Sequence, residues 1–178
     1  MLEGIEVHLS SLMEYPDLPE IVEDGNSFLE NALKKARAVA ESTGEIVLAD
    51  DSGLEVDALG GAPGIYSARY AGKDADDQQN IRKLLDDLKG IAFEKRGAAF
   101  RCILVLYPAD GCYETFEGRW EGMIAKKPAG QGGFGYDPVF FLPGEGMTVA
   151  QLSSEVKNRI SHRAQAFAKL KEKLRRGA

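Results

Sequence analysis

The sequence contains only two cysteines in 178 residues, and it has no long apolar run. Its longest continuous apolar segments are short, such as Cys102-Ile103-Leu104-Val105-Leu106-Tyr107. A helix that crosses a membrane needs about 20 predominantly apolar residues. The start of the chain has neither the basic segment nor the long apolar segment of a secretory signal. We therefore expect no membrane partner and a cytoplasmic location.

Positive charge is also scarce. The chain has 22 Lys and Arg residues against 28 Asp and Glu residues, which gives a net charge of −6. Non-specific binding to nucleic acid requires a basic surface, so we expect no nucleic-acid partner. A small phosphate ligand is not excluded, because a metal ion and a few cationic side chains can neutralise it locally.

The two cysteines do not predict a disulfide. Cys102 and Cys112 fall on opposite arms of a predicted hairpin, residues 98–107 and 112–124, with its turn at 108–111. That turn pairs Cys112 with about Tyr107, so Cys102 has no cysteine opposite it. We expect two buried thiols, consistent with a reducing compartment.

Several catalytic motifs are absent. The chain has no P-loop, no H-E-x-x-H, no C-x-x-C and no G-x-S-x-G serine. The segment from Gly130 to Pro138 formally contains G-x-G-x-x-G, but no buried strand directly precedes it. Tyr-Asp-Pro follows where a dinucleotide fold would begin a helix. Neither covalent hydrolase chemistry nor a dinucleotide fold has support in the sequence.

The hydrophobic pattern predicts helices over 28–43, 74–88 and 155–176, strands over 5–12 and 46–49, and the hairpin 98–107/112–124. Asn26 or Ser27 can cap the first helix, and Gly44 ends it. No linker or repeat divides the chain. We therefore expect one α/β domain over 1–178, with a mixed twisted central sheet flanked by helices. We expect two lobes with the active-site cleft between them.

Two acidic segments are candidates for metal chemistry. Asp50 and Asp51 directly follow the buried strand, and carboxylate oxygens suit Mg²⁺ or Mn²⁺. Because neighbouring strand residues point to opposite faces, one aspartate can face a metal while the other supports the loop. An Asx turn is the alternative. Glu23 lies in a second acidic segment, before the first helix, where acids also interact favourably with the helix dipole.

Two further segments are candidates for binding a nucleotide. The glycine-rich segment 130–138 carries Phe134, Tyr136 and Asp137, whose rings can stack on a base while backbone groups read its edge. A glycine-rich connecting loop is the alternative. In the last helix, His162 can donate to a base carbonyl and Arg163 can reach a phosphate or a base edge. The alternative there is a solvated basic face.

Taken together, these segments resemble the inosine triphosphate pyrophosphatase family, which hydrolyses non-standard purine nucleoside triphosphates. The resemblance runs from about residue 5 to the C-terminus, and five motifs in order are far more specific than any one of them. The matching stretches are Val22-Glu23-Asp24-Gly25…Phe28-Leu29-Glu30-Asn31-Ala32…Lys35-Ala36, Ala49-Asp50-Asp51-Ser52-Gly53-Leu54, 59–70 (LGGAPGIYSARY), Gly132-Gly133-Phe134-Gly135-Tyr136-Asp137-Pro138 and Lys157…Ile160-Ser161-His162-Arg163.

The resemblance implies Mg²⁺-dependent hydrolysis of ITP, dITP or XTP to the monophosphate and pyrophosphate, with Mn²⁺ as an alternative ion. It implies a homodimer. Asp51 would be the general base and a metal ligand, and Glu23 would be a second metal ligand. The residues implied to bind the nucleoside triphosphate are Ser52, Phe134, Gly135, Tyr136, Asp137, Lys157, His162 and Arg163.

One part of the family pattern is missing. Family members begin with an apolar strand, a T-x-N-x-x-K loop that binds phosphate and a helix. This chain starts at Met1-Leu2-Glu3-Gly4, which resembles the end of that helix. We expect the missing segment to lie upstream of Met1. The alternative is a catalytically impaired paralogue that binds nucleotide or dimerises.

Overall fold

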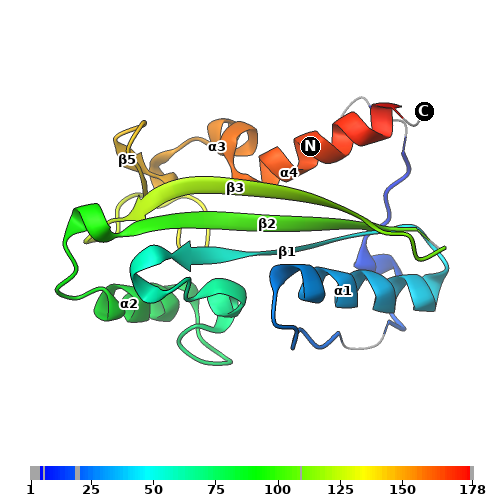
Figure 1. The fold of residues 1–178 in the computed structure, drawn as a ribbon, viewed down its shortest axis with the longest axis horizontal. Coiled ribbons are helices and arrows are strands. Elements are labelled where there is room, and N and C mark those ends of the chain that lie inside the picture. The colour runs from blue at the N-terminus through cyan, green and yellow to red at the C-terminus, as the bar shows by residue number, and fades with distance from the viewer. Residues whose placement is uncertain (1–4, 6, 19–20, 109, 177–178) are drawn as a thin grey trace.

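The computed structural model describes residues 5, 7–18, 21–108 and 110–176. They form a sheet that lies between two helical layers (Figure 1). Helix α1 (Phe28–Thr43) packs on β1 and β2, and α4 (His162–Arg176) packs on the other face of the sheet, against β2 and β3. The remaining elements are β1 (Val47–Val56), α2 (Asp77–Asp87), β2 (Gly97–Tyr107), β3 (Glu114–Ile124), β4 (Phe140–Leu142), β5 (Met147–Thr148) and α3 (Ser154–Ile160).

The sheet has the strand order β1-β2-β3-β4-β5, and each neighbouring pair is antiparallel. The prediction of a mixed sheet is therefore wrong for the described residues. Helices between strands suggested parallel crossovers, but Val56 pairs with Ala98. The segment that contains α2 thus leaves and re-enters the sheet at the same end, without a crossover. The two lobes and their cleft stay a prediction.

Strand β1 is longer than expected and lies at an edge of the described sheet, not at its centre. Asp50 and Asp51 lie within this strand, opposite Leu104 and Ile103 of β2. The sequence Asp-Asp-Ser-Gly favours a turn locally, but the backbone ladder with β2 keeps it extended. Gly53 is required here, because a Cβ would lie 2.7 Å from Ser67 Oγ and 2.8 Å from a ring carbon of Phe28.

Local capping signals predicted the bounds of α1 correctly. The hydroxyl of Ser27 accepts a hydrogen bond from the N–H of Glu30 (3.1 Å), and Gly44 ends α1 in the left-handed region. The predicted apolar face of α1 is buried or half-buried against the sheet. Helix α2 begins three residues later than predicted, because Asp76 forms a capping box with Gln79.

The predicted C-terminal helix is two helices. The backbone of Ser161 is extended (ψ 162°), and its hydroxyl accepts a hydrogen bond from the N–H of Ala164 (3.2 Å) at the start of α4. The break separates Lys157 on α3 from His162 and Arg163 on α4. The helical spacing assumed from the sequence therefore does not hold across residue 161.

The predicted strand over 5–12 is not formed. Residues 7–11 are not part of a strand, and Val7 and Leu9 are exposed. The alternating pattern has no partner strand among the described residues, so nothing holds it extended. Glu6 and the start at Met1–Gly4, expected to be the end of a helix, lie outside the described residues.

The cysteine predictions are half correct. Both cysteines are free, and Cys102 is buried opposite Gly118 of β3. Cys112 is exposed, so the prediction of two buried thiols is wrong. In the part of the chain that the structure describes, no helix is both long enough and apolar enough to cross a membrane.

Candidate active site

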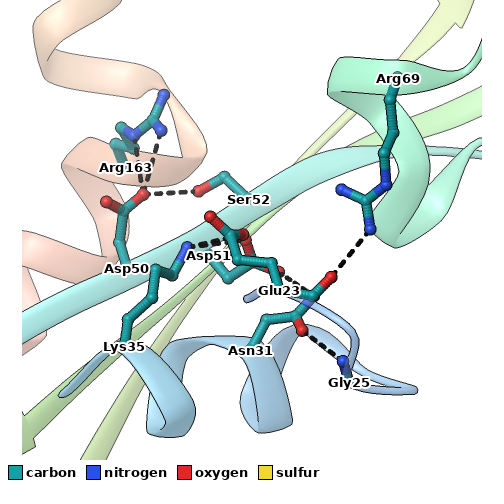
Figure 2. Close-up of polar contacts among 9 residues, drawn as sticks. All are labelled: Glu23, Gly25, Asn31, Lys35, Asp50, Asp51, Ser52, Arg69 and Arg163. Carbon is teal, nitrogen blue, oxygen red and sulfur yellow. Dashed lines mark hydrogen bonds and ion pairs between the residues drawn. The ribbon is translucent and has the colours of Figure 1, made fainter. Parts of the chain in front are cut away.

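The carboxylate of Asp51 is the centre of the first half of the site (Figure 2). It points from β1 toward α1, where Asn31 Nδ2 donates to Asp51 Oδ2 (3.3 Å) and Lys35 Nζ donates to Oδ1 (3.0 Å). Burial raises the pKa of Asp51 above its ordinary value, against the opposing effects of the Lys35 ammonium and the hydrogen bonds from Lys35 and Asn31. A buried carboxylate of raised pKa suits a general base.

Glu23 joins Asp51 through a shared cation. Lys35 Nζ lies 3.1 Å from Glu23 Oε2 and 3.0 Å from Asp51 Oδ1, so two carboxylates converge on one ammonium group. The backbone carbonyl of Glu23 also accepts a hydrogen bond from Arg69 (3.0 Å). Asn31, fully buried, accepts a hydrogen bond from the N–H of Gly25 (2.8 Å) and so fixes the loop that carries Glu23.

This donor set fits a divalent cation. Glu23 and Asp51 already hold a positive charge between them, and their oxygen ligands are the type that Mg²⁺ prefers. Among the described residues, no group of three or more His, Cys, Asp or Glu side chains could hold a metal. Mg²⁺ is commonly bound by one or two carboxylates plus substrate phosphates and water, so two carboxylates suffice.

Asp50 points to the opposite face of β1, toward α4 (Figure 2). Its Oδ2 accepts hydrogen bonds from Arg163 Nε (3.2 Å) and Nη2 (3.0 Å) and from Ser52 Oγ (3.1 Å). The structure thus brings together two predicted substrate-binding residues, Ser52 and Arg163, around an aspartate to which the sequence assigned no definite partner.

The glycine-rich segment 130–138 forms the second half of the site. Phe134 is 62% exposed, with Lys157 Nζ at 4.2 Å and Arg163 Cζ at 5.9 Å from its ring centroid. Asp137 is buried, pairs with Lys157 and accepts a hydrogen bond from the N–H of Phe134 (2.9 Å). An exposed ring flanked by two cations is suited to stacking on a base next to phosphate groups.

Two other members of this segment are placed differently from the prediction. Tyr136 is buried, and its hydroxyl donates to the carbonyl of Ser67 (2.9 Å), so only Phe134 presents a ring for stacking. The N–H of Gly135 donates to Asp77 Oδ2 at the start of α2 (2.6 Å). In this structure that N–H is therefore already engaged.

His162 is buried behind the site. Its ring stacks on Phe100 (4.9 Å between centroids) and lies 6.5 Å from Trp120, and its Nδ1 has no hydrogen-bond partner among the described residues. Burial, followed by the charges of Arg163 and Lys157, lowers the pKa of His162 from 6.5 to about 3. The imidazole is thus neutral at physiological pH.

The pKa of His162 predicts a loss of stability in acid. The unfolded chain binds this proton as the pH falls through 6.5, whereas the folded chain binds it only near pH 3, so stability decreases between these values. At pH 4.5 the cost is about 2–3 kcal/mol. Urea unfolding at pH 7 and pH 4.5 measures the loss in the free energy of unfolding. This loss should be smaller by that amount in His162→Phe than in the wild type. Parallel losses in both proteins would contradict the prediction.

Asn31 and Lys35 are site residues that were not predicted from the sequence. They lie four residues apart in α1, so they share one side of the helix. A buried asparagine within an otherwise apolar helix face was the available signal. A surface hollow of about 550 Å³ along the start of α2, lined by Gly72, Lys73 and Arg82 among others, contains none of the predicted site residues. That hollow shares no residue with the side-chain network at β1.

Together, the fold and the site define an α/β protein with a carboxylate–lysine centre and an exposed aromatic ring flanked by two cations. The chain belongs to the Ham1 family, whose model matches residues 1–173. This confirms the resemblance found in the sequence.

Individual relatives are similar to this chain over nearly its whole length. The dITP/XTP pyrophosphatase of Geobacter sulfurreducens is 52% identical over 174 residues, which is 98% of this chain and 87% of that protein. The dITP/XTP pyrophosphatase of Shouchella clausii is 53% identical over 166 residues, covering 92% and 83%. Among solved structures, a HAM1 protein from Coxiella burnetii has a TM-score of 0.92 at 42% identity, covering 98% of this chain and 89% of that one.

Proposed function

We propose that this chain hydrolyses non-standard purine nucleoside triphosphates (dITP, ITP and XTP) to the monophosphate and pyrophosphate, which removes them from the nucleotide pool. The observation that carries the proposal is the convergence of Asp51 and Glu23 on Lys35. On the same strand, Asp50 contacts Arg163, which reaches the ring of Phe134. The names of its relatives, which are more than 50% identical, support the substrate class.

The residues of the chain divide the reaction between them. Asp51 accepts the proton of a water molecule that attacks a phosphorus next to the oxygen bridging the α- and β-phosphates; the P–O bond to that oxygen breaks, and the monophosphate and pyrophosphate are released. Lys35 offsets part of the negative charge of the triphosphate. Mg²⁺, held by Glu23 and Asp51, would supply Lewis-acid polarisation of the phosphate oxygens. Asn31 keeps Asp51 and the Glu23 loop in register through its two hydrogen bonds.

Base selectivity follows from the hydrogen-bond donors that lie beside the ring of Phe134. Phe134 offers a ring for stacking, while the cations of Lys157 and Arg163 stand beside it. Such groups donate hydrogen bonds to the 6-keto oxygen of hypoxanthine or xanthine, whereas the 6-amino group of adenine would place a donor against a donor. We also propose that the active protein is a homodimer, which sedimentation velocity tests.

The test is pyrophosphate release by the full chain with Mg²⁺. We expect kcat/KM for dITP, ITP and XTP to exceed that for ATP by at least about 100-fold, because buried mismatched donors are costly. Omission of the divalent ion should abolish release, and Mn²⁺ should restore part of it. Equal rates on ATP would contradict the selectivity. Calorimetric binding of dITP without release of pyrophosphate would identify an impaired paralogue instead.

A further inference from the structure

We infer that Asp50 is a positioning residue for the part of the site that binds the base: it holds the guanidinium of Arg163 beside Phe134. The inference rests on the proposed function, since it assigns a role in binding that substrate. Arg163 is the only cation among the described residues that contacts both Asp50 and the Phe134 ring. Asp50 therefore holds Arg163 from β1, and Arg163 in turn contacts Phe134 of the glycine-rich segment.

The alternation of side chains along β1 separates the contacts of Asp50 from those of Asp51. Asp51 and Asp50 are neighbours on β1, so their side chains leave opposite faces of the strand. Asp51 meets Lys35 of α1, whereas Asp50 meets Arg163 of α4 (Figure 2). One strand therefore sets the position of the hydrolytic carboxylate and of the base-side cation.

The contact is arranged for orientation more than for folding stability. The side chains of Asp50 and Arg163 are 38% and 35% exposed, and ion pairs of this exposure contribute little to folding. Both Nε and Nη2 of Arg163 donate to the same oxygen, Asp50 Oδ2. Two contacts from one planar group fix its direction, which a single contact to a flexible side chain does not.

Ser52 adds a second reason for the aspartate. Its hydroxyl donates to the same oxygen, Asp50 Oδ2 (3.1 Å), so Asp50 fixes the direction in which the Ser52 hydroxyl points. The single oxygen Oδ2 thus orients both predicted substrate contacts, Ser52 and Arg163.

The experiment is a double-mutant cycle with Asp50→Asn, Arg163→Gln and the double variant in the full chain. Steady-state pyrophosphate release from dITP with Mg²⁺ gives kcat and KM, and calorimetry gives the affinity for the α,β-imido analogue of dITP. We expect each single variant to raise KM and the analogue Kd about tenfold with little change in kcat. KM and Kd of the double variant should be no higher than those of Arg163→Gln alone, because both changes remove the same contact between Asp50 and Arg163.

Glu55→Gln is the matched control, because Glu55 also lies on β1 and pairs with two arginines, Arg101 and Arg119, away from the site. It should leave KM unchanged. Trp120, the single tryptophan, lies beside His162 at the start of α4, so its fluorescence reports whether that helix has moved. Unchanged emission and melting temperature in Asp50→Asn, with the tenfold effect, support positioning.

Three outcomes would overturn the inference. They are a wild-type KM and Kd in Asp50→Asn, effects that multiply in the double variant, or an altered Trp120 spectrum that accompanies the loss of affinity. Failure of the proposed function is distinct. The wild type would then bind the analogue without releasing pyrophosphate from dITP, and the binding cycle would still decide the role of Asp50. Absence of analogue binding by the wild type would overturn both.

Discussion

Asp51→Asn is expected to lower kcat for dITP by about 10³-fold while the protein stays folded. The amide keeps the shape of the side chain and accepts hydrogen bonds from Asn31 or Lys35, but it cannot take a proton from water. Burial already raises the pKa of Asp51, so the folded state favours a neutral group at this position. The melting temperature should therefore be unchanged or higher.

The measurement is steady-state pyrophosphate release, with thermal unfolding of both proteins at pH 7. Asp24→Asn is the matched control, because Asp24 pairs with Lys34 of α1 next to the site and is exposed. It should retain wild-type kcat. A kcat within about tenfold of wild type in Asp51→Asn would show that another group accepts the proton.

Gly118→Ala is expected to disrupt the base side of the site by displacing α4 from the sheet. A Cβ on Gly118 would lie 2.8 Å from the carbonyl carbon of His162 and 2.9 Å from the N atom of Ala166, and still closer to the carbonyl oxygen of His162. These are backbone atoms of α4, so the helix itself has to move. We expect a loss of about 1–3 kcal/mol in the free energy of unfolding. Arg163 moves with the helix, so the KM for dITP should rise as well.

Urea unfolding measures the first effect, and dITP kinetics measure the second. Gly144→Ala is the control, because a Cβ there meets no heavy atom within 4 Å. It should change stability by less than about 0.5 kcal/mol. Equal stability of Gly118→Ala and the wild type would mean that α4 is not held against β3 by this close approach.

Local signals in the sequence were enough for much of the fold. Ser27 and Gly44 bounded α1, because capping depends on residues within one turn of the helix end. The hairpin of β2 and β3 followed from alternation and one turn. The signals misled at residues 7–12, which pair with no strand among the described residues, and at Ser161, whose extended backbone ends α3.

For the site, the sequence by itself determined the chemical inventory: adjacent carboxylates at 50–51, a glutamate before the first helix, an aromatic glycine-rich segment and a basic C-terminal segment. Only the tertiary structure decided which of these groups contact one another and which are buried. It directs Asp51 to Lys35 and Asp50 to Arg163, buries Tyr136 and His162, and leaves Phe134 exposed. The physical reason is that composition and spacing fix which groups are near in the chain. The packing of α1 and α4 on opposite faces of one edge strand fixes which groups meet.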